Sequence, residues 1–138
     1  MKKFIFYCLT ASLFLLASCE KEVATTKTTK EKLVGRWNYV SRVSNHFYND
    51  SSHITTYTYQ AGDYIQFYNN GTVTSLENGI SNSNTYGVID ATTIWIGNWI
   101  DWTTIKSLTG TDMQFYIKTN NGFGTTINYT ETTTNLKK

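Results

Sequence analysis

The strongest pattern in the sequence lies in Leu33-Val34-Gly35-Arg36-Trp37-Asn38-Tyr39-Val40-Ser41-Arg42-Val43. Its residues alternate with a period of two, so that one face carries Leu33, Gly35, Trp37, Tyr39, Ser41 and Val43, and the other carries Val34, Arg36, Asn38, Val40 and Arg42. Such alternation is typical of a half-buried β-strand, because successive side chains point to opposite faces of a sheet. We therefore predict a strand here.

A β-hairpin is predicted further along the chain. Ile65 and Phe67 face one way, Asn69-Asn70-Gly71 supplies residues that tolerate a positive φ, and Val73 resumes the inward face. We expect further strands at about residues 53–60, 84–90, 92–96, 103–108, 113–118 and 125–132. Most of the breaks between them are rich in turn residues: Glu77-Asn78-Gly79, Gly97-Asn98, Gly110-Thr111-Asp112 and Asn120-Asn121-Gly122.

This spacing predicts an all-β fold, an antiparallel up-and-down meander of eight or nine strands. The chain has no proline, so open sheet edges would be unprotected, and closure into a barrel removes them. We therefore favour a β-barrel over a sandwich. Helical periodicity is lacking, apart from a possible single turn over residues 28–33.

Length and composition restrict the classes of function. With 138 residues, 40% hydrophobic and 16% charged, the chain fits one small globular domain. Its patterned region, residues 33–134, has four lysines and arginines against seven aspartates and glutamates, a net charge of −3. Nucleic-acid binding needs a clustered cationic surplus, so nucleic acid is not expected as a partner.

The N-terminus has the features of a secretory signal. Met1-Lys2-Lys3 is basic, Phe4 to Leu16 is an apolar run, and Ala17-Ser18 is a small-residue exit. The run is shorter than the roughly 20 residues of a transmembrane helix, so we expect a cleaved leader at residues 1–18.

The end of this leader, Leu16-Ala17-Ser18-Cys19, resembles the lipobox of bacterial lipoproteins. The resemblance implies cleavage before Cys19 and lipidation of its thiol, with the membrane as a partner. We then expect a flexible tether at residues 19–32, the folded domain at 33–134 and a frayed tail at 135–138. The other cysteine, Cys8, leaves with the leader, so no disulfide or thiolate chemistry is expected.

Several segments are similar to the short lipocalin-like lipoprotein domains of Bacteroidota. The segments are Leu33-Val34-Gly35-Arg36-Trp37, Gly62 to Phe67, Asn70-Gly71-Thr72-Val73, Tyr86 to Asp90, and Ile105 to Thr109 with Met113. The resemblance implies an up-and-down barrel fixed to the cell envelope, at the periplasmic face or surface of the outer membrane. It also implies that Gly35 lets the chain pass beneath the barrel floor and that Trp37 plugs it. Larger lipocalins place a late arginine over this tryptophan, whereas no arginine follows Arg42 here.

Catalytic motifs are not apparent. His46 and His53 are the only histidines, placed in or beside a predicted loop, and they define no metal-ligand geometry. Asp90, Asp101 and Asp112 are interpreted as turn caps. We therefore expect no enzyme, no metal and no cofactor.

Aromatic residues are the remaining candidates for function, since 17 of 21 lie beyond the leader. One hypothesis is packing, because a small barrel needs large side chains to fill its lumen. The other is a barrel mouth that stacks on an apolar ligand or a glycan, formed by Tyr57, Tyr59, Trp95, Trp99 and Trp102. The corresponding functions are a ligand-binding envelope lipoprotein and, as the alternative, a structural or protein-interaction module with a filled core.

Overall fold

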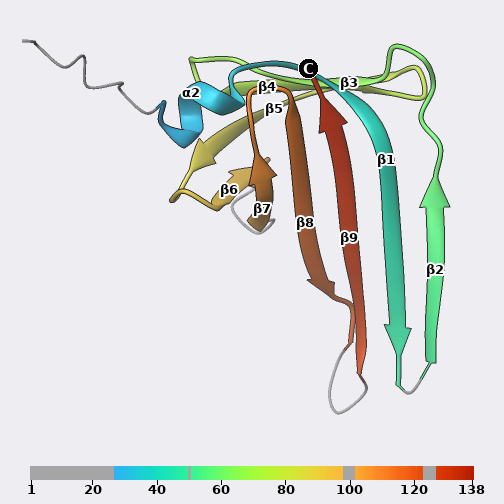
Figure 1. The fold of residues 1–138 in the computed structure, drawn as a ribbon. Coiled ribbons are helices and arrows are strands. Elements are labelled where there is room, and N and C mark those ends of the chain that lie inside the picture. The colour runs from blue at the N-terminus through green and yellow to red at the C-terminus, as the bar shows by residue number, and fades with distance from the viewer. Residues whose placement is uncertain (1–26, 50, 98–101, 123–126) are drawn as a thin grey trace, which may run out of the picture.

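The computed structural model describes residues 27–49, 51–97, 102–122 and 127–138. The predicted leader, Cys19 and the first part of the tether lie outside these residues. The described chain forms one short helix and nine strands (Figure 1). Their bounds are α2 (Thr29–Leu33), β1 (Gly35–Tyr48), β2 (Ser51–Tyr57), β3 (Tyr64–Phe67), β4 (Thr72–Glu77), β5 (Ile80–Val88), β6 (Thr93–Ile96), β7 (Trp102–Leu108), β8 (Asp112–Asn120) and β9 (Asn128–Lys137). The described part of the chain contains no helix long and apolar enough to span a membrane.

The strands form one antiparallel sheet in the order β2-β1-β3-β4-β5-β6-β7-β8-β9. An additional pairing of β1 with β9 closes the sheet, so that β1 and β3 to β9 make an eight-stranded barrel and β2 is an extra strand. Strand β1 has two partners along its other edge, because residues 35–38 pair with β3 and residues 42–48 pair with β2. The prediction of an all-β antiparallel barrel is confirmed.

Two of the predicted turns have the expected backbone. Gly71, between β3 and β4, has a φ of +87°, and Asn78 and Gly79, between β4 and β5, have φ values of +51° and +81°. These positive values suit glycine and asparagine, which explains why Asn-Gly pairs stand at both reversals. The hairpin register aligns Phe67 with Val73, so both point to the same face, as predicted.

The hydrophobic core forms one cluster inside the barrel. Phe67 packs edge to face with Tyr86, at 4.9 Å between ring centres, and with Phe115, at 6.1 Å. The cluster consists of Leu33, Trp37, Ile65, Phe67, Val73, Tyr86, Ile94, Ile105, Met113, Phe115 and Leu136.

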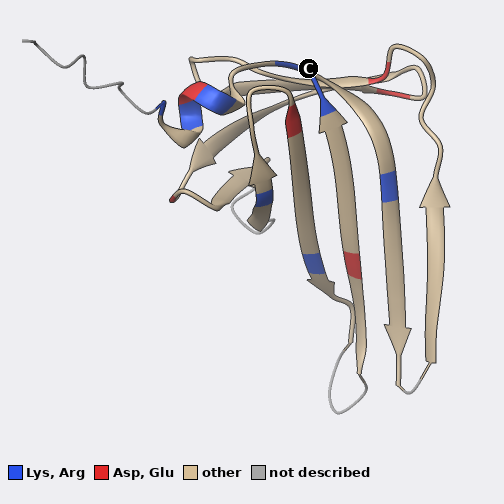
Figure 2. Cartoon of the chain, in the orientation of Figure 1, with Lys and Arg blue, Asp and Glu red and all other residues tan. Residues whose placement is uncertain are grey.

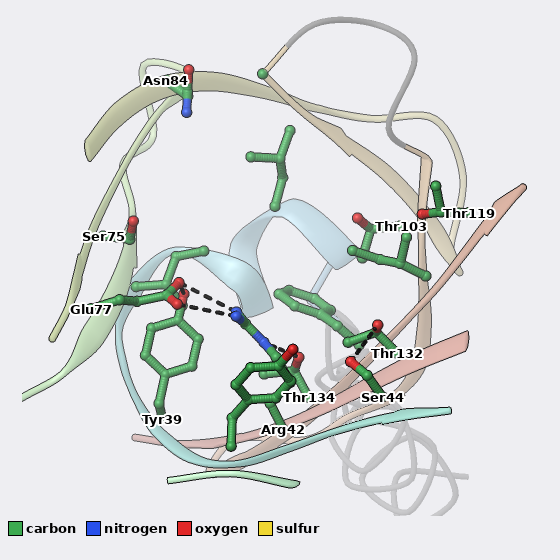
Figure 3. Close-up of a pocket in the computed structure, with 16 residues that line it drawn as sticks. Tyr39, Arg42, Ser44, Ser75, Glu77, Asn84, Thr103, Thr119, Thr132 and Thr134 are labelled. Atoms are coloured by element: carbon green, nitrogen blue, oxygen red, sulfur yellow. Dashed lines mark hydrogen bonds and ion pairs between the residues drawn. The ribbon is translucent and has the colours of Figure 1, made fainter. Parts of the chain in front are cut away.

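Helix α2 covers one end of the barrel, as the view along the barrel in Figure 3 shows. A capping box starts it, in which the Thr28 hydroxyl accepts a hydrogen bond from the Glu31 amide and the Glu31 carboxylate accepts one from the Thr28 amide. At the other end of the helix, Leu33 is fully buried. Gly35 then reverses the chain into β1 with a φ of +124°, a value that favours glycine.

Trp37 lies fully buried beneath this helix. Its indole Nε1 donates a hydrogen bond of 2.7 Å to the carbonyl oxygen of Leu33. The Lys138 ammonium lies 4.5 Å from the centre of the Trp37 ring and donates to the carbonyl oxygens of Lys32 and Val34. A lysine near the end of β9 therefore covers the Trp37 ring.

The expectation of a frayed tail at residues 135–138 is wrong. Strand β9 continues to Lys137 and is held by β1 on one side and β8 on the other. Leu136 is only 1% exposed and belongs to the core. Residues 135–138 contain one leucine and three polar residues, which is too short a pattern to predict a strand. This end of β9 forms because it pairs with β1 and β8.

Candidate functional site

The barrel contains a cavity of about 740 Å³ on the side of the core away from α2 (Figure 3). It is open to solvent. Side chains from β1, β3, β4, β8 and β9 line much of it, and most of the lining residues are polar. This cavity is the candidate functional site.

A β-bulge in β1 turns Arg42 toward this cavity. In the pairing with β9, Tyr39 lies opposite Leu136 and Ser41 lies opposite Asn135, so Val40 is an extra residue. Beyond the bulge the faces exchange, and Arg42 lines the cavity while Val40 is 54% exposed. The prediction that Ser41 and Val43 share a face with Trp37 is therefore wrong, because one inserted residue reverses a period of two.

Arg42 forms a two-contact ion pair with Glu77, at the end of β4. Its Nη1 lies 3.2 Å from Glu77 Oε2, and its Nη2 donates to Glu77 Oε1 at 3.3 Å. The Tyr39 hydroxyl also donates to Glu77 Oε1, at 2.7 Å, while Arg42 Nε donates to Thr134 Oγ1 at 3.4 Å. Figure 3 shows the guanidinium pointing toward the carboxylate, beside Tyr39.

The ionisable side chains beside the cavity have charges that cancel. Burial, and the hydrogen bond to Glu77, raise the pKa of Tyr39, so the phenol stays protonated and acts as a donor. Burial also raises the pKa of Tyr59 to about 12. One guanidinium and one carboxylate thus face each other between neutral phenols, and the site carries no net charge.

Hydroxyl groups make up much of the remaining wall. Ser44 on β1 and Thr132 on β9 are hydrogen-bonded to each other at 2.9 Å, and both line the cavity. Further polar side chains on the wall are Tyr57, Ser75, Asn84, Thr103, Thr119 and Thr134. The apolar part of the wall is formed by Ile65, Ile96, Phe115 and Ile117. A ligand here would meet both hydrogen-bonding groups and a substantial apolar surface.

The two predicted tyrosines lie at or beside the cavity. Tyr57, on β2, lines it and is 45% exposed. Tyr59 stacks on Tyr39 with 4.3 Å between ring centres, and the Arg42 guanidinium carbon lies 5.4 Å from the Tyr59 ring centre. The Tyr59 hydroxyl is buried without a hydrogen bond of normal geometry.

The predicted tryptophans are not brought to this cavity. Trp95 on β6 stands between Ile94, which is in the core, and Ile96, which lines the cavity, so Trp95 faces outward. Its indole lies against Gly87, and Trp102, its partner in the β6–β7 register, is 59% exposed. Trp99 lies outside the described residues. The structure therefore separates the two tyrosines from Trp95 and Trp102.

The histidines lie in strands and not in a loop. His46 on β1 and His53 on β2 are opposite each other in the strand register, and His46 Nδ1 is 3.0 Å from Thr130 Oγ1. Among the described residues, no group of three or more histidine, cysteine, aspartate or glutamate side chains could hold a metal ion.

Arg42, Glu77 and the hydroxyl wall were not predicted as site residues. Arg42 was assigned to the wrong face because the bulge precedes it, and Glu77 was interpreted as part of a turn. A usable signal existed in Thr130-Glu131-Thr132-Thr133-Thr134, where alternate threonines bring one row of hydroxyls inward.

Comparison with known protein families, curated proteins and solved structures finds no match for this chain.

Proposed function

We propose that this protein is a lipid-anchored, lipocalin-like protein of the cell envelope that binds a small ligand in its barrel cavity without catalysis. Of the two ligand classes expected, an apolar molecule or a glycan fragment, we favour the glycan. The observation that carries this proposal is the cavity of about 740 Å³ with its polar wall.

The size of the cavity suits a small molecule. Ligand pockets usually enclose about 300–1,000 Å³, and this cavity falls within that range. The core stays packed on the α2 side, where Trp37 and Phe67 are at most 1% exposed, so occupation of the cavity would not require the core to open. A barrel with a packed end and an open end can therefore hold a ligand at little cost in stability.

The chemistry of the wall favours a neutral, hydroxyl-bearing ligand. Serine and threonine hydroxyls can both donate and accept, which matches the hydroxyl groups of a sugar. The carboxylate of a fatty acid would need a cation to pair with, but Arg42 already forms an ion pair with both oxygens of Glu77. Burying a long alkyl chain against hydroxyl groups would also leave those groups without hydrogen bonds, which is unfavourable.

The site supports binding better than catalysis. Glu77 is the single carboxylate among the described residues that line the cavity, and that lining includes no histidine or cysteine. The Glu77 carboxylate is held by Arg42 and by the Tyr39 hydroxyl, so it is not available as a general base. General acid–base chemistry usually requires a group that can exchange its proton near neutral pH.

The ligand class can be tested with a soluble form of the chain that begins at Lys27. We expect saturable binding of short neutral oligosaccharides in isothermal titration calorimetry, and weaker binding of fatty acids. Thr132→Val removes one wall hydroxyl at nearly constant volume, so affinity for the oligosaccharide should fall about five- to tenfold. Thr74→Val is the control, because Thr74 on β4 does not line the cavity. Binding of fatty acids alone would contradict the glycan assignment, and equal losses in both variants would contradict the site.

The lipid anchor is tested separately in the full-length chain. Cys19→Ala should release the protein from the membrane fraction, because a lipidated cysteine would supply the stable attachment. Cys8→Ala is the matched control and should leave the protein with the membranes, since Cys8 lies within the predicted leader. A Cys19→Ala protein with its leader cleaved that still sediments with membranes after a high-salt wash would refute the anchor.

A further inference from the structure

Strand β2 has one edge without a partner. It pairs with β1 from Ser51 to Tyr57, and no other strand of the described chain pairs with it. In Figure 1 it stands at the side of the barrel, joined to the rest of the sheet through β1 alone. Its outer edge therefore presents a row of backbone N–H and C=O groups to solvent, which is a template for pairing with another strand.

The usual protections against such pairing are missing from this strand. Its sequence, Ser51-Ser52-His53-Ile54-Thr55-Thr56-Tyr57, contains no lysine, arginine, aspartate, glutamate or proline. Figure 2 shows β2 without any charged residue, whereas charges mark β1, β8 and β9. Its register with β1 is also continuous, without a bulge that would twist the edge away. Edge strands of stable monomers commonly carry at least one of these features.

The side chains of β2 are largely exposed on both faces. Six of its seven residues are exposed, and Ile54 is 63% exposed. A strand that is held by one neighbour and little side-chain packing is only marginally stable in water. A further strand on the open edge would supply the missing hydrogen bonds and cover apolar surface.

We propose that β2 pairs with β2 of a second copy of this chain, in antiparallel orientation, to join the two barrels through one continuous sheet. A two-fold axis through Ile54 aligns all seven residues, with Ser51 opposite Tyr57 and His53 opposite Thr55 of the other copy. It also places the two Ile54 side chains next to each other on the same face. Because the strand is uncharged, this symmetric pairing brings no like charges together.

The second copy is favoured over an unrelated partner by this self-complementarity. Exposed β-branched side chains dominate the middle of β2, and each would meet another β-branched or polar side chain across the axis. The contact is a single strand edge and is smaller than the standard interface of roughly 1,600 Å². We therefore expect a weak dimer that forms at high local concentration, as on a shared membrane.

Chemical cross-linking in membranes of cells that express the full-length chain tests this pairing. Ile54→Cys should give a dimer with a short bis-maleimide reagent, at several times the yield of the unmodified chain, which sets the background. Ile80→Cys is the matched control, because Ile80 is also an exposed isoleucine in a strand, at 65%. Equal yields from the two variants would overturn the proposal, as would a cross-linked product of Ile54→Cys with the mass of a different partner.

Sedimentation of the full-length chain in mild detergent gives an independent readout. Ile54→Lys should shift the protein from dimer toward monomer by placing two like charges at the axis, whereas Ile80→Lys should leave the dimer unchanged. A dimer that survives Ile54→Lys would show that another surface is used, and a wild-type chain that is monomeric at all concentrations tested would exclude the pairing. Ile54 does not line the cavity, so ligand binding and dimerisation can fail independently.

Discussion

Replacing Trp37 by alanine is expected to lower the free energy of unfolding by about 3–5 kcal/mol. The side chain is fully buried in the centre of the closed end, so its removal leaves a cavity bordered by the remaining core. The change also deprives the Leu33 carbonyl of its indole donor and removes the ring beneath the Lys138 ammonium. Each of these losses adds to the cost of the cavity.

Urea unfolding of the soluble form, followed by far-ultraviolet circular dichroism, measures this effect. Trp102→Ala is the control, because Trp102 is 59% exposed and its removal should cost about 1 kcal/mol or less. Trp37→Phe keeps much of the apolar volume but not the N–H donor, and should fall between the wild type and Trp37→Ala. Similar stabilities for the two alanine variants would mean that Trp37 does not close the barrel.

The second large effect is expected at the C-terminus. Leu136→Ala should lower the free energy of unfolding by about 2–5 kcal/mol, as for other leucines in packed cores. Leu136 is 1% exposed, and its strand is bonded on both sides, so the surrounding structure has little freedom to fill the space. Loss of this side chain should also weaken the hydrogen bonds from Lys138 to the carbonyl oxygens of Lys32 and Val34.

The same urea experiment distinguishes a packed Leu136 from a frayed C-terminus, for which Leu136→Ala would change the free energy of unfolding little. Ile80→Ala provides the control, since Ile80 is 65% exposed and its truncation should change stability by about 0.5 kcal/mol or less. If Leu136→Ala were as harmless as Ile80→Ala, residues 135–138 would not belong to the folded domain in solution. A large loss would establish that Leu136 is packed in the core in solution.

The cavity combines predictable and unpredictable parts. Its strands and hairpins follow from the alternation around Trp37 and from the Asn-Gly pairs at residues 70–71 and 78–79, which act over a few residues. The Arg42–Glu77 pair depends instead on a bulge in β1 and on the placement of β4 two strands away from β1 in the sheet. Neither residue has a local signal that indicates the other, because 35 positions separate them in the chain.

The hypothesis of an aromatic barrel mouth was also predictable only in part. A high density of tyrosine and tryptophan near turns is visible in the sequence, and Tyr57 does line the cavity. Whether a given aromatic points into the lumen depends on the register of its strand, and one position separates inward from outward. Trp95 and Trp102 therefore share a strand pair with Ile94 and Thr103, which point inward, while facing the opposite way.

Sequence information alone was sufficient for the properties that depend on short stretches of chain. These are the strand character, the main reversals, the single helical turn before β1 and the antiparallel all-β class, because alternation and turn chemistry act between near neighbours. The fold in three dimensions was required for the pairing of β1 with β9, the reversal of faces after Val40, the burial of Leu136 and the open edge of β2. Each of these arises from contacts between strands distant in the sequence, where the position of one strand is set by its partners and not by its own residues.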